Sequence, residues 1–271
     1  MVNRFNNNLS SLVVVKGAGD LATGVAHRLV SAGFPIVMTE ISHPTVVRRS
    51  VSFAEAVFDG ESEVEGVTAR LISEIKEAEQ VLQNGEVPVI VDPAMECLEV
   101  LNPQFLVEAT VSKKNTGVSR DDAPVVIALG PGFTAGEDVD AVVETKRGHY
   151  LGKVLYNGSA APNTGKPGSI DGYTVERVLY APTGGLFQEK SRIGDQVNYG
   201  DFVAYVDDQP VTAELSGTVR GLLRSGLKVK QGMKVGDIDP RCSVDHCYTI
   251  SDKARSIGGG VLEAMLALAN N

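Results

Sequence analysis

The first half of the chain alternates between two kinds of segment. Short runs rich in β-branched residues are separated by segments in which apolar residues recur at helical spacing, as Leu21, Val25 and Leu29 do. Such alternation indicates parallel strands connected by helices that cover both faces of a sheet. The β-rich runs are residues 12–15, 35–41, 64–72, 87–91, 105–111 and 125–129. We therefore expect an α/β fold, with a Rossmann-like parallel sheet domain over residues 1–137.

The second half of the chain has a different sequence pattern. From about residue 138, short strand-like runs are divided by Gly, Asn and Pro turns, and helical periodicity returns only near Val261 and Met265. We expect a β-rich module over residues 138–271. Its C-terminal helix is expected to return to the first domain.

An ungapped internal repeat with an offset of 32 residues lies inside this module. One copy is too small to bury a core alone, so the two copies should interlock. The pattern, over about residues 179–239, resembles the barrel-sandwich hybrid of biotinyl and lipoyl carrier domains. Those carriers place a modifiable lysine in the turn between copies, whereas residues 207–210 here contain none. We expect no covalent biotin or lipoate. The residues Ala181, Gly185, Arg192, Gly194, Val197, Gly200, Val203 and Asp207 recur as Ala213, Gly217, Arg224, Gly226, Val229, Gly232, Val235 and Asp239.

Charge and composition exclude several classes of protein. The formal net charge of −9 argues against a broad nucleic-acid surface. No apolar run approaches the roughly 18–20 residues that span a bilayer, and the polar residues 1–11 do not resemble a signal peptide. Three cysteines are an odd number and imply no disulfide framework. We expect a cytoplasmic protein with no membrane partner.

A glycine motif follows the first strand-like run and opens a helix. Gly17, Gly19 and Ala22 fit the pattern G-x-G-x-x-G/A, in which glycines permit a tight turn and close approach of a pyrophosphate. The motif also contains Leu21 and Asp20. The carboxylate of Asp20 would repel a phosphate unless it points away. The alternative is a glycine turn that binds nothing.

An acidic residue ends the second run. Glu40 lies 23 residues after Gly17, where a carboxylate would accept the ribose hydroxyls of an adenine nucleotide. This placement favours NAD over NADP, although the nearby Arg48 and Arg49 make the preference weaker. NAD or another nucleotide-like ligand is therefore the expected cofactor.

Three further segments are candidate parts of the same cleft, which we expect between the two domains. Gly130, Gly132 and Thr134 belong to a second glycine-rich loop, which could form an anion nest or a simple turn. Lys113 follows the fifth run and is either a phosphate partner or a solvated surface residue. Lys253 and Arg255 precede three glycines at the start of the last helix, which is an anion site or a hinge.

Catalytic and metal sites are not evident. Cys242 and Cys247, with His246 between them, lack the second ligand pair of a closed zinc site, and we expect no metal. No Ser-His-Asp or Cys-His set can be assembled from spacing. The catalytic residues, if any, stay unknown.

Several longer segments resemble the YqeB family, accessory proteins of the selenium-dependent molybdenum hydroxylase system. The resemblance covers about residues 12–266 and implies a partner among molybdenum hydroxylases or other maturation proteins. It implies no catalytic residue. The segments are residues 16–28 (KGAGDLATGVAHR), 53–57 (FAEAV), 129–136 (LGPGFTAG), 144–149 (ETKRGH) and 250–264 (ISDKARSIGGGVLEA).

Three functions are compatible with these observations. The first is an accessory or maturation protein that binds a nucleotide-like ligand through its Rossmann-like domain. The second is an NAD-dependent oxidoreductase with Lys113 near the nicotinamide, although no Tyr-x-x-x-Lys or His-Asp pair supports it. The third is a non-enzymatic interaction module that docks a client enzyme. Binding of a nucleotide, hydride transfer and failure of every nucleotide to bind would distinguish them.

Overall fold

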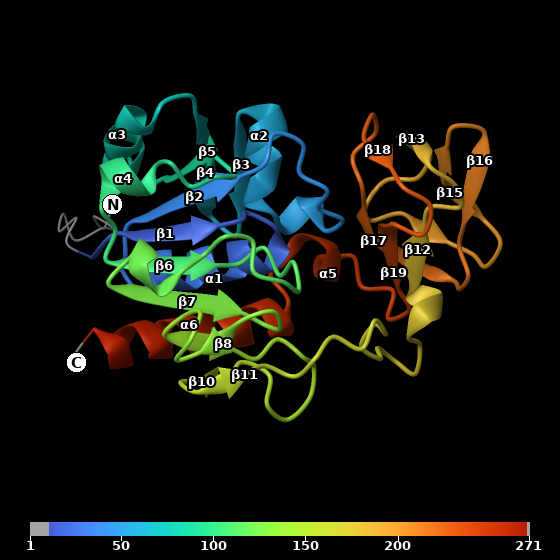
Figure 1. Ribbon diagram of the computed structural model, residues 1–271. Helices are drawn as coiled ribbons and strands as arrows, with labels where there is room; N and C mark the ends of the chain where they lie inside the picture. Colours follow the sequence, from blue (N-terminus) through green and yellow to red (C-terminus); the bar gives the residue numbers. More distant parts are fainter. Residues whose placement is uncertain (1–10, 270–271) are drawn as a thin grey trace. The chain divides into compact units, whose positions relative to one another are not determined.

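The computed structural model describes residues 11–269, and the first ten residues of the polar segment in which we expect no signal peptide lie outside this range. The chain forms two compact units (Figure 1). Unit 1 comprises Met1–Pro44, Ser52–Asn163 and Ile250–Asn271, and unit 2 comprises Thr45–Val51 and Thr164–Thr249.

Unit 1 is built on a nine-stranded sheet with the order β10-β9-β7-β6-β1-β2-β5-β4-β3. Neighbours from β9 to β4 are parallel, whereas β10 and β3 pair antiparallel at the two edges. The expected purely parallel, Rossmann-like sheet is therefore wrong, since the sheet is mixed. The strands are β1 (Val13–Lys16), β2 (Ile36–Glu40), β3 (Glu61–Val64), β4 (Val67–Ile72), β5 (Val87–Val91), β6 (Phe105–Glu108), β7 (Val125–Leu129), β9 (Ala141–Val143) and β10 (Val154–Leu155). The short strands β8 (Thr134–Ala135) and β11 (Gly158–Ser159) form a separate antiparallel pair.

The antiparallel edge at β3 arises from a turn inside one apolar run. The run at residues 64–72 was expected to be a single strand, but Glu65 and Gly66 have positive φ angles of 46° and 77°. Two successive left-handed residues make the type of tight turn that joins antiparallel strands. The chain folds back there, so Val64 ends β3 and Val67 begins β4.

Two helices pack together on unit 1. Helix α1 (Asp20–Ser31) ends before Gly33, whose φ of 90° suits a C-terminal cap, and α6 (Asp252–Leu268) is capped by the Ser251 hydroxyl. Glycines allow their close contact, since a Cβ on Gly24 would lie 2.6 Å from the Cβ of Ala254. The remaining helices of unit 1 are short: α2 (Ala56–Asp59), α3 (Ala78–Gln83) and α4 (Leu98–Leu101), with 3-10 turns at Phe53–Glu55, Ile75–Glu77 and Arg120–Asp122.

Unit 2 consists of two separate four-stranded antiparallel sheets, with the orders β12-β19-β17-β14 and β16-β15-β13-β18. The two copies of the repeat interlock as expected, because β14 of the first copy pairs with β17 and β18 of the second copy pairs with β13. The lipoyl-like barrel-sandwich expected for this region is nevertheless wrong: the structure gives two distinct sheets in its place. The elements are β12 (Val178–Tyr180), β13 (Gly185–Glu189), β14 (Gln196–Val197), β15 (Phe202–Val206), β16 (Gln209–Thr212), β17 (Gly217–Leu222), β18 (Lys228–Val229), β19 (Lys234–Asp239) and α5 (Asp245–Tyr248), with 3-10 turns at Arg49–Val51 and Val175–Arg177.

A Gly–Asp contact explains part of the repeat. A Cβ on Gly185 would lie 2.6 Å from the carboxylate carbon of Asp207, and one on Gly217 would lie 2.5 Å from the carbonyl oxygen of Asp239. Both pairs bring two strands of one copy too close for any side chain larger than hydrogen. Close packing therefore explains why both copies of the repeat carry glycine at these positions.

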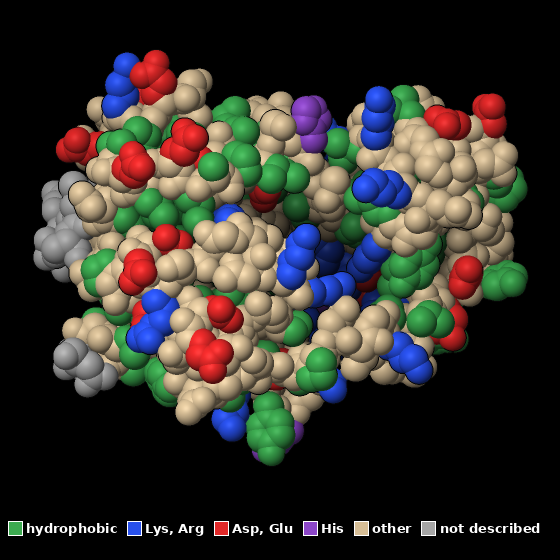
Figure 2. Space-filling model, in the orientation of Figure 1, with side chains coloured by type: hydrophobic (Ala, Val, Ile, Leu, Met, Phe, Trp, Pro, Cys, Tyr) green, Lys and Arg blue, Asp and Glu red, His purple; other side chains and the backbone are tan. Residues whose placement is uncertain are grey.

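The surface of unit 1 carries mixed charge. Acidic and basic side chains are interspersed over its visible face, with apolar side chains between them (Figure 2). Among residues 11–269, no helix combines the length and the apolar composition needed to cross a bilayer.

Candidate functional site

The direction in which the sheet of unit 1 is wound reverses between β1 and β6. From β1 the chain proceeds to β2 and then to β3, β4 and β5 on the same side of β1, and it then returns to place β6 on the other side (Figure 1). In open α/β sheets, ligands bind outside the carboxyl ends of the strands where this reversal occurs. The residues at that edge are Lys16 on β1, Glu108 on β6, and Thr39 and Glu40 on β2.

Three polar residues lie side by side in the register of the sheet. Lys16 pairs with Glu108 on one side and with Thr39 on the other. Residues two positions earlier on the three strands, among them Val14 and Leu106, belong to one apolar cluster, so the polar residues project from that same face. Glu108 is 0% exposed, Thr39 1% and Lys16 6%. We call these three residues the polar row.

Glu108 has one engaged and one unused carboxylate oxygen. Its Oε1 accepts hydrogen bonds from the backbone N–H of Thr110, at 3.2 Å, and from the Thr110 hydroxyl. Its Oε2 is buried without a hydrogen-bond partner among the described residues. Burial raises the pKa of Glu108, although the hydrogen bonds from Thr110 and the charge of Lys16 oppose the rise. An unpartnered buried oxygen costs stability, so this feature requires an explanation.

The other two members of the row also have unused hydrogen-bonding capacity. The Lys16 ammonium donates one hydrogen bond, to the carbonyl oxygen of Thr116 at 3.1 Å. The Thr39 hydroxyl is buried and has no partner within residues 11–269. The row thus combines a cation, a carboxyl group and a hydroxyl group in an apolar surrounding, where electrostatic interactions are strong.

A segment without helix or strand covers the row. Residues 110–118, which we call the strap, begin at the Thr110 hydrogen bonds to Glu108 and continue to Thr116 over Lys16. Val111 and Lys113 have φ angles of 51° and 67°. A β-branched residue in the left-handed region is strained, and such strain is concentrated at functional sites.

Two other carboxylates at the same edge are fully engaged. Glu40 accepts the backbone N–H groups of Ala18 and Ile41, each at 2.8 Å. Glu144, after β9, accepts those of Lys146 and Ala161, each at 2.7 Å. Burial raises the pKa of Glu40, and its two hydrogen bonds oppose the rise. Only Glu108, of these three, keeps an unused oxygen.

The glycine motif forms a turn, and a carboxylate of the protein, that of Glu40, accepts one of its backbone N–H groups. Gly17 has a φ of 94°, Gly19 is the N-cap of α1, and Asp20, Leu21 and Ala22 form the first turn. The Ala18 N–H, at the entrance to this helix, is donated to Glu40. A Cβ on Gly17 would lie 3.3 Å from Thr110. Close packing of the strap and the Glu40 carboxylate therefore explain the motif without a phosphate.

The second glycine-rich loop is also explained by close packing. A Cβ on Gly130 would meet the Thr145 side chain, and one on Gly132 would lie 2.5 Å from the backbone nitrogen of Lys114. Thr134 hydrogen-bonds Ser159 through its hydroxyl, at 3.1 Å. Lys113 lies exposed on the strap. The structure brings Gly132 and the strap together and places Thr134 on β8.

The two basic residues predicted at the start of the last helix, Lys253 and Arg255, lie on α6 in unit 1. Arg255 donates to both carboxylate oxygens of Glu65, at 2.7 Å each, and the Ile250 N–H donates to Glu65 as well. These contacts fasten α6 to the β3–β4 turn. Lys253 lies in the first turn of the same helix.

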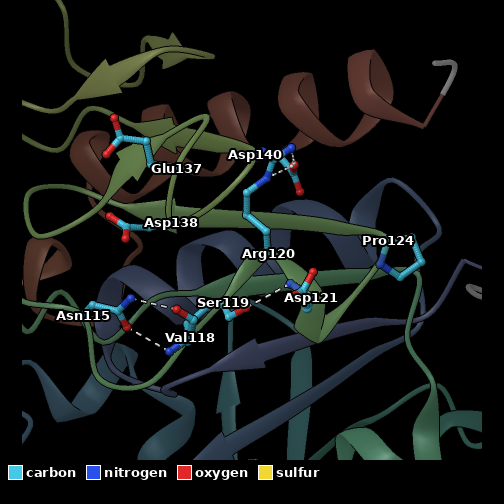
Figure 3. A pocket seen from close by; sticks show the side chains of 9 residues that line it. All are labelled: Asn115, Val118, Ser119, Arg120, Asp121, Pro124, Glu137, Asp138 and Asp140. Carbon is cyan, nitrogen blue, oxygen red and sulfur yellow. Dashed lines mark hydrogen bonds and ion pairs between the residues drawn. The ribbon is translucent and has the colours of Figure 1, made fainter.

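A polar pocket of about 610 Å³ opens beside the strap, lined by its end and by the loop before β9 (Figure 3). Arg120 donates to Asp140 at 2.6 and 2.8 Å, and Asp140 also accepts the Val126 N–H. The pocket wall is therefore held by an internal ion pair. The lining residues are Asn115, Val118, Ser119, Arg120, Asp121, Pro124, Glu137, Asp138 and Asp140.

Thiols and metal ligands do not form a site in the described part of the chain. Within residues 11–269, no group of three or more His, Cys, Asp or Glu side chains is arranged to hold a metal ion. Cys247 is buried and Cys242 exposed, and both thiols are free. Burial raises the pKa of Cys247, which makes its thiolate less accessible.

Sequence reasoning missed the polar row. Lys16 was part of the glycine motif, but Thr39 and Glu108 were not candidates. The signal for Glu108 was its place inside an otherwise apolar run, Phe105–Glu108 with Ala109 after it, because a carboxylate is seldom fully buried unless it is paired or functional.

Comparison with solved structures returns proteins named as aspartoacylase-family proteins and succinylglutamate desuccinylases. An aspartoacylase family protein from Mesorhizobium loti is 14% identical, with a TM-score of 0.28 and coverage of 84% of each chain. A succinylglutamate desuccinylase from Silicibacter is 13% identical, with a TM-score of 0.24 and coverage of 86% of this chain and 85% of that chain. Scores this low assign neither fold nor activity to this chain.

The structure corrects the predicted function, a nucleotide-binding maturation protein with a Rossmann-like domain and a lipoyl-like module. The mixed sheet, the two antiparallel sheets and the Glu40 carboxylate at the glycine turn agree with that correction. The prediction was wrong because a strand–glycine–helix sequence describes the turn and not its occupant.

Comparison with curated sequences returns a relative that matches most of this chain. No family model matches the chain. YqeB of Escherichia coli K12 is 53% identical over 257 residues, which are 95% of this chain and 48% of the relative. The chain thus spans about half the length of the curated relative that it matches. Over nearly its whole length, this chain is therefore similar to YqeB of Escherichia coli K12.

Proposed function

We propose that unit 1 binds a small polar molecule at the carboxyl ends of β1 and β6 and exchanges a proton with it through Glu108. The observation that carries this proposal is the Glu108 Oε2 atom, which is fully buried, unpartnered among the described residues and next to Lys16 in the sheet register. A ligand atom at this position would satisfy the oxygen.

The environment of Glu108 suits acid–base chemistry. A general acid or base works best when its pKa lies near the working pH, and burial moves the pKa of Glu108 upward in that direction. Lys16, beside it, would stabilise negative charge that develops on the bound molecule. The strap over the row would exclude water while the proton moves.

A thermal-shift screen of small metabolites tests the proposal. NAD, which the glycine motif alone suggests, belongs in the screen beside sugars, amides, amines and carboxylic acids. A ligand at 100 times its dissociation constant adds about 2.7 kcal/mol of stability. We expect at least one compound to stabilise the wild-type protein and to lose this effect in Glu108→Gln.

The matched control is Glu144→Gln. Glu144 lies at the same edge of the sheet, but both its oxygens accept backbone hydrogen bonds. The control should keep the ligand-induced shift even if its baseline melting temperature falls. If no compound stabilises the wild type, or if every shift survives in Glu108→Gln, the proposed site is wrong.

A protein partner is a separate proposal. The resemblance to the YqeB family suggests a molybdenum hydroxylase of the same cell as the partner, and the sequence segments quoted above are its support. Affinity purification of the tagged chain, followed by assay of the eluate for molybdenum and hydroxylase subunits, tests it. An eluate that contains neither contradicts the partnership.

A further inference from the structure

We infer that the molecule bound by the polar row is a small 2-hydroxy carboxylate, with its carboxylate on Lys16 and Thr39 and its hydroxyl on Glu108. This inference rests on the proposed function. It goes further by naming the class of ligand from the hydrogen-bonding groups that the row leaves unused.

The unused donors gather on one side of the row. A lysine ammonium has three N–H donors, and Lys16 gives one of them to Thr116. The Thr39 hydroxyl, on the neighbouring strand, is a further donor without a partner among the described residues. Two adjacent donors, one of them charged, fit a carboxylate, whose oxygens are acceptors only.

The unused acceptor lies on the other side. Glu108 Oε2 is on the strand that flanks Lys16 opposite to Thr39, and neighbouring strands are about 4.8 Å apart. A ligand carboxylate between Lys16 and Thr39 therefore leaves its next carbon toward Glu108. A hydroxyl group on that carbon both donates and accepts, so it pairs with Glu108 in either protonation state.

Charge balance adds a condition that can be measured. Lys16 carries +1 and ionised Glu108 carries −1, so a bound carboxylate would leave one uncompensated negative charge in a buried site, which is costly. Lys16 is the charged side chain whose field acts on Glu108, and the Thr110 side chain and backbone supply its hydrogen bonds. Uptake of one proton by Glu108 restores neutrality. Ligand binding should therefore be coupled to proton uptake.

Calorimetric titration of the full chain with glycolate and with L-lactate tests the inference. Titrations in two buffers of different ionisation enthalpy, at several pH values between about 6 and 8, report the number of protons taken up. Where the pH lies above the pKa of Glu108, we expect proton uptake to approach one proton per ligand and the affinity to fall about tenfold per pH unit. Glu108→Gln should bind glycolate at least tenfold more weakly, and the binding that remains should show no proton uptake and little dependence on pH.

Two further variants test the carboxylate end of the ligand. Lys16→Met should weaken binding of glycolate at least tenfold. Thr39→Val should also weaken binding of glycolate, but by a smaller factor. Thr39→Val keeps the shape of the side chain, so it remains informative if Lys16→Met does not fold. Glu144→Gln is the control and should bind as the wild type does.

The outcomes separate the inference from the proposed function. If a neutral compound from the screen binds in a Glu108-dependent manner while glycolate and lactate do not, the ligand class is wrong and the site stands. If acetate binds as tightly as glycolate, the hydroxyl contact to Glu108 is wrong. If no compound depends on Glu108, the proposed site itself fails.

Discussion

Gly24 of α1 and Ala254 of α6 touch so closely that a Cβ on Gly24 would lie 2.6 Å from the Cβ of Ala254. Gly258, one turn further along α6, meets the Gly24 carbonyl oxygen in the same way, at 2.9 Å. We expect Gly24→Ala to destabilise the protein by about 1–3 kcal/mol, because overpacking outweighs the better helix propensity of alanine. Urea unfolding followed by far-UV circular dichroism measures the change.

The control for this substitution lies in the same helix pair. Gly259 of α6 has nothing within 4 Å of a built Cβ. Gly259→Ala should therefore stabilise the protein by roughly 0.5–1 kcal/mol, since glycine inside a helix costs conformational entropy. Equal effects of the two substitutions would show that α1 and α6 leave room for a methyl group at Gly24.

Asp239 holds a cluster of cations in unit 2. Burial alone would raise its pKa, but hydrogen bonds from Arg241 and the charges of Arg241 and Arg220 lower the pKa to about 2. Because the folded pKa lies below the ordinary value of 3.8, the ionised form adds stability above pH 3.8 and loses it as the pH falls toward 2. Asp239→Asn should cost about 1.5–3 kcal/mol near neutral pH, because Arg241 loses a charged hydrogen-bond acceptor and Arg220 keeps only its ion pair with Asp237.

The internal repeat supplies a matched control for Asp239. Asp207 occupies the equivalent position of the first copy, but its carboxylate accepts the backbone N–H of Leu186 at 2.9 Å and forms no ion pair with another described residue. Asp207→Asn should cost only about 1 kcal/mol, the usual net contribution of a hydrogen bond. Similar losses in the two variants at neutral pH would contradict the ionic role assigned to Asp239.

Strands that are apolar throughout could be located from the sequence. Strands that end in a charged residue, or that are divided by a turn, could not be bounded correctly. The run Val125–Leu129 is buried at every position and coincides with β7. The first run was placed one residue early, at 12–15, because Lys16 is charged although it ends β1. In the run 64–72 a Glu-Gly pair turns the chain, where Asn-Gly or Asp-Gly would have been the usual signal.

The polar row depends on strand order, which local sequence does not contain. Lys16 and Glu108 are 92 positions apart, and their contact exists only because the chain returns to place β6 beside β1. The glycine motif, in contrast, is local, and it predicted the turn between β1 and α1. Its occupant could not be predicted, because Glu40 reaches the Ala18 N–H from the end of another strand.

Glu108 should make stability depend on pH in a predictable direction. Burial raises its folded pKa above the ordinary value of 4.5, so the folded state binds more protons than the unfolded state between these two pKa values. Its contribution is therefore fully present below pH 4.5 and declines as the pH rises through the folded pKa. Glu108→Gln should gain stability relative to the wild type over that interval, as measured by urea unfolding from pH 4 to 8. A difference that does not change with pH would contradict the raised pKa.

Lys16 should hold the strap closed. Its hydrogen bond to the Thr116 carbonyl oxygen is the described contact that joins β1 to the middle of the strap, while Val111 and Lys113 store strain in left-handed conformations. A hydrogen bond to a charged group contributes about 1.5–3 kcal/mol, so its loss should increase local opening of the strap. We expect Lys16→Met to accelerate amide hydrogen exchange in residues 111–117 by at least tenfold, with little change in β7. The exposed Lys114 provides the control, since Lys114→Met removes a charge from the strap without breaking this contact. Exchange that is unchanged in Lys16→Met, or that is equally fast in both variants, would mean that the strap is held by its own backbone and not by Lys16.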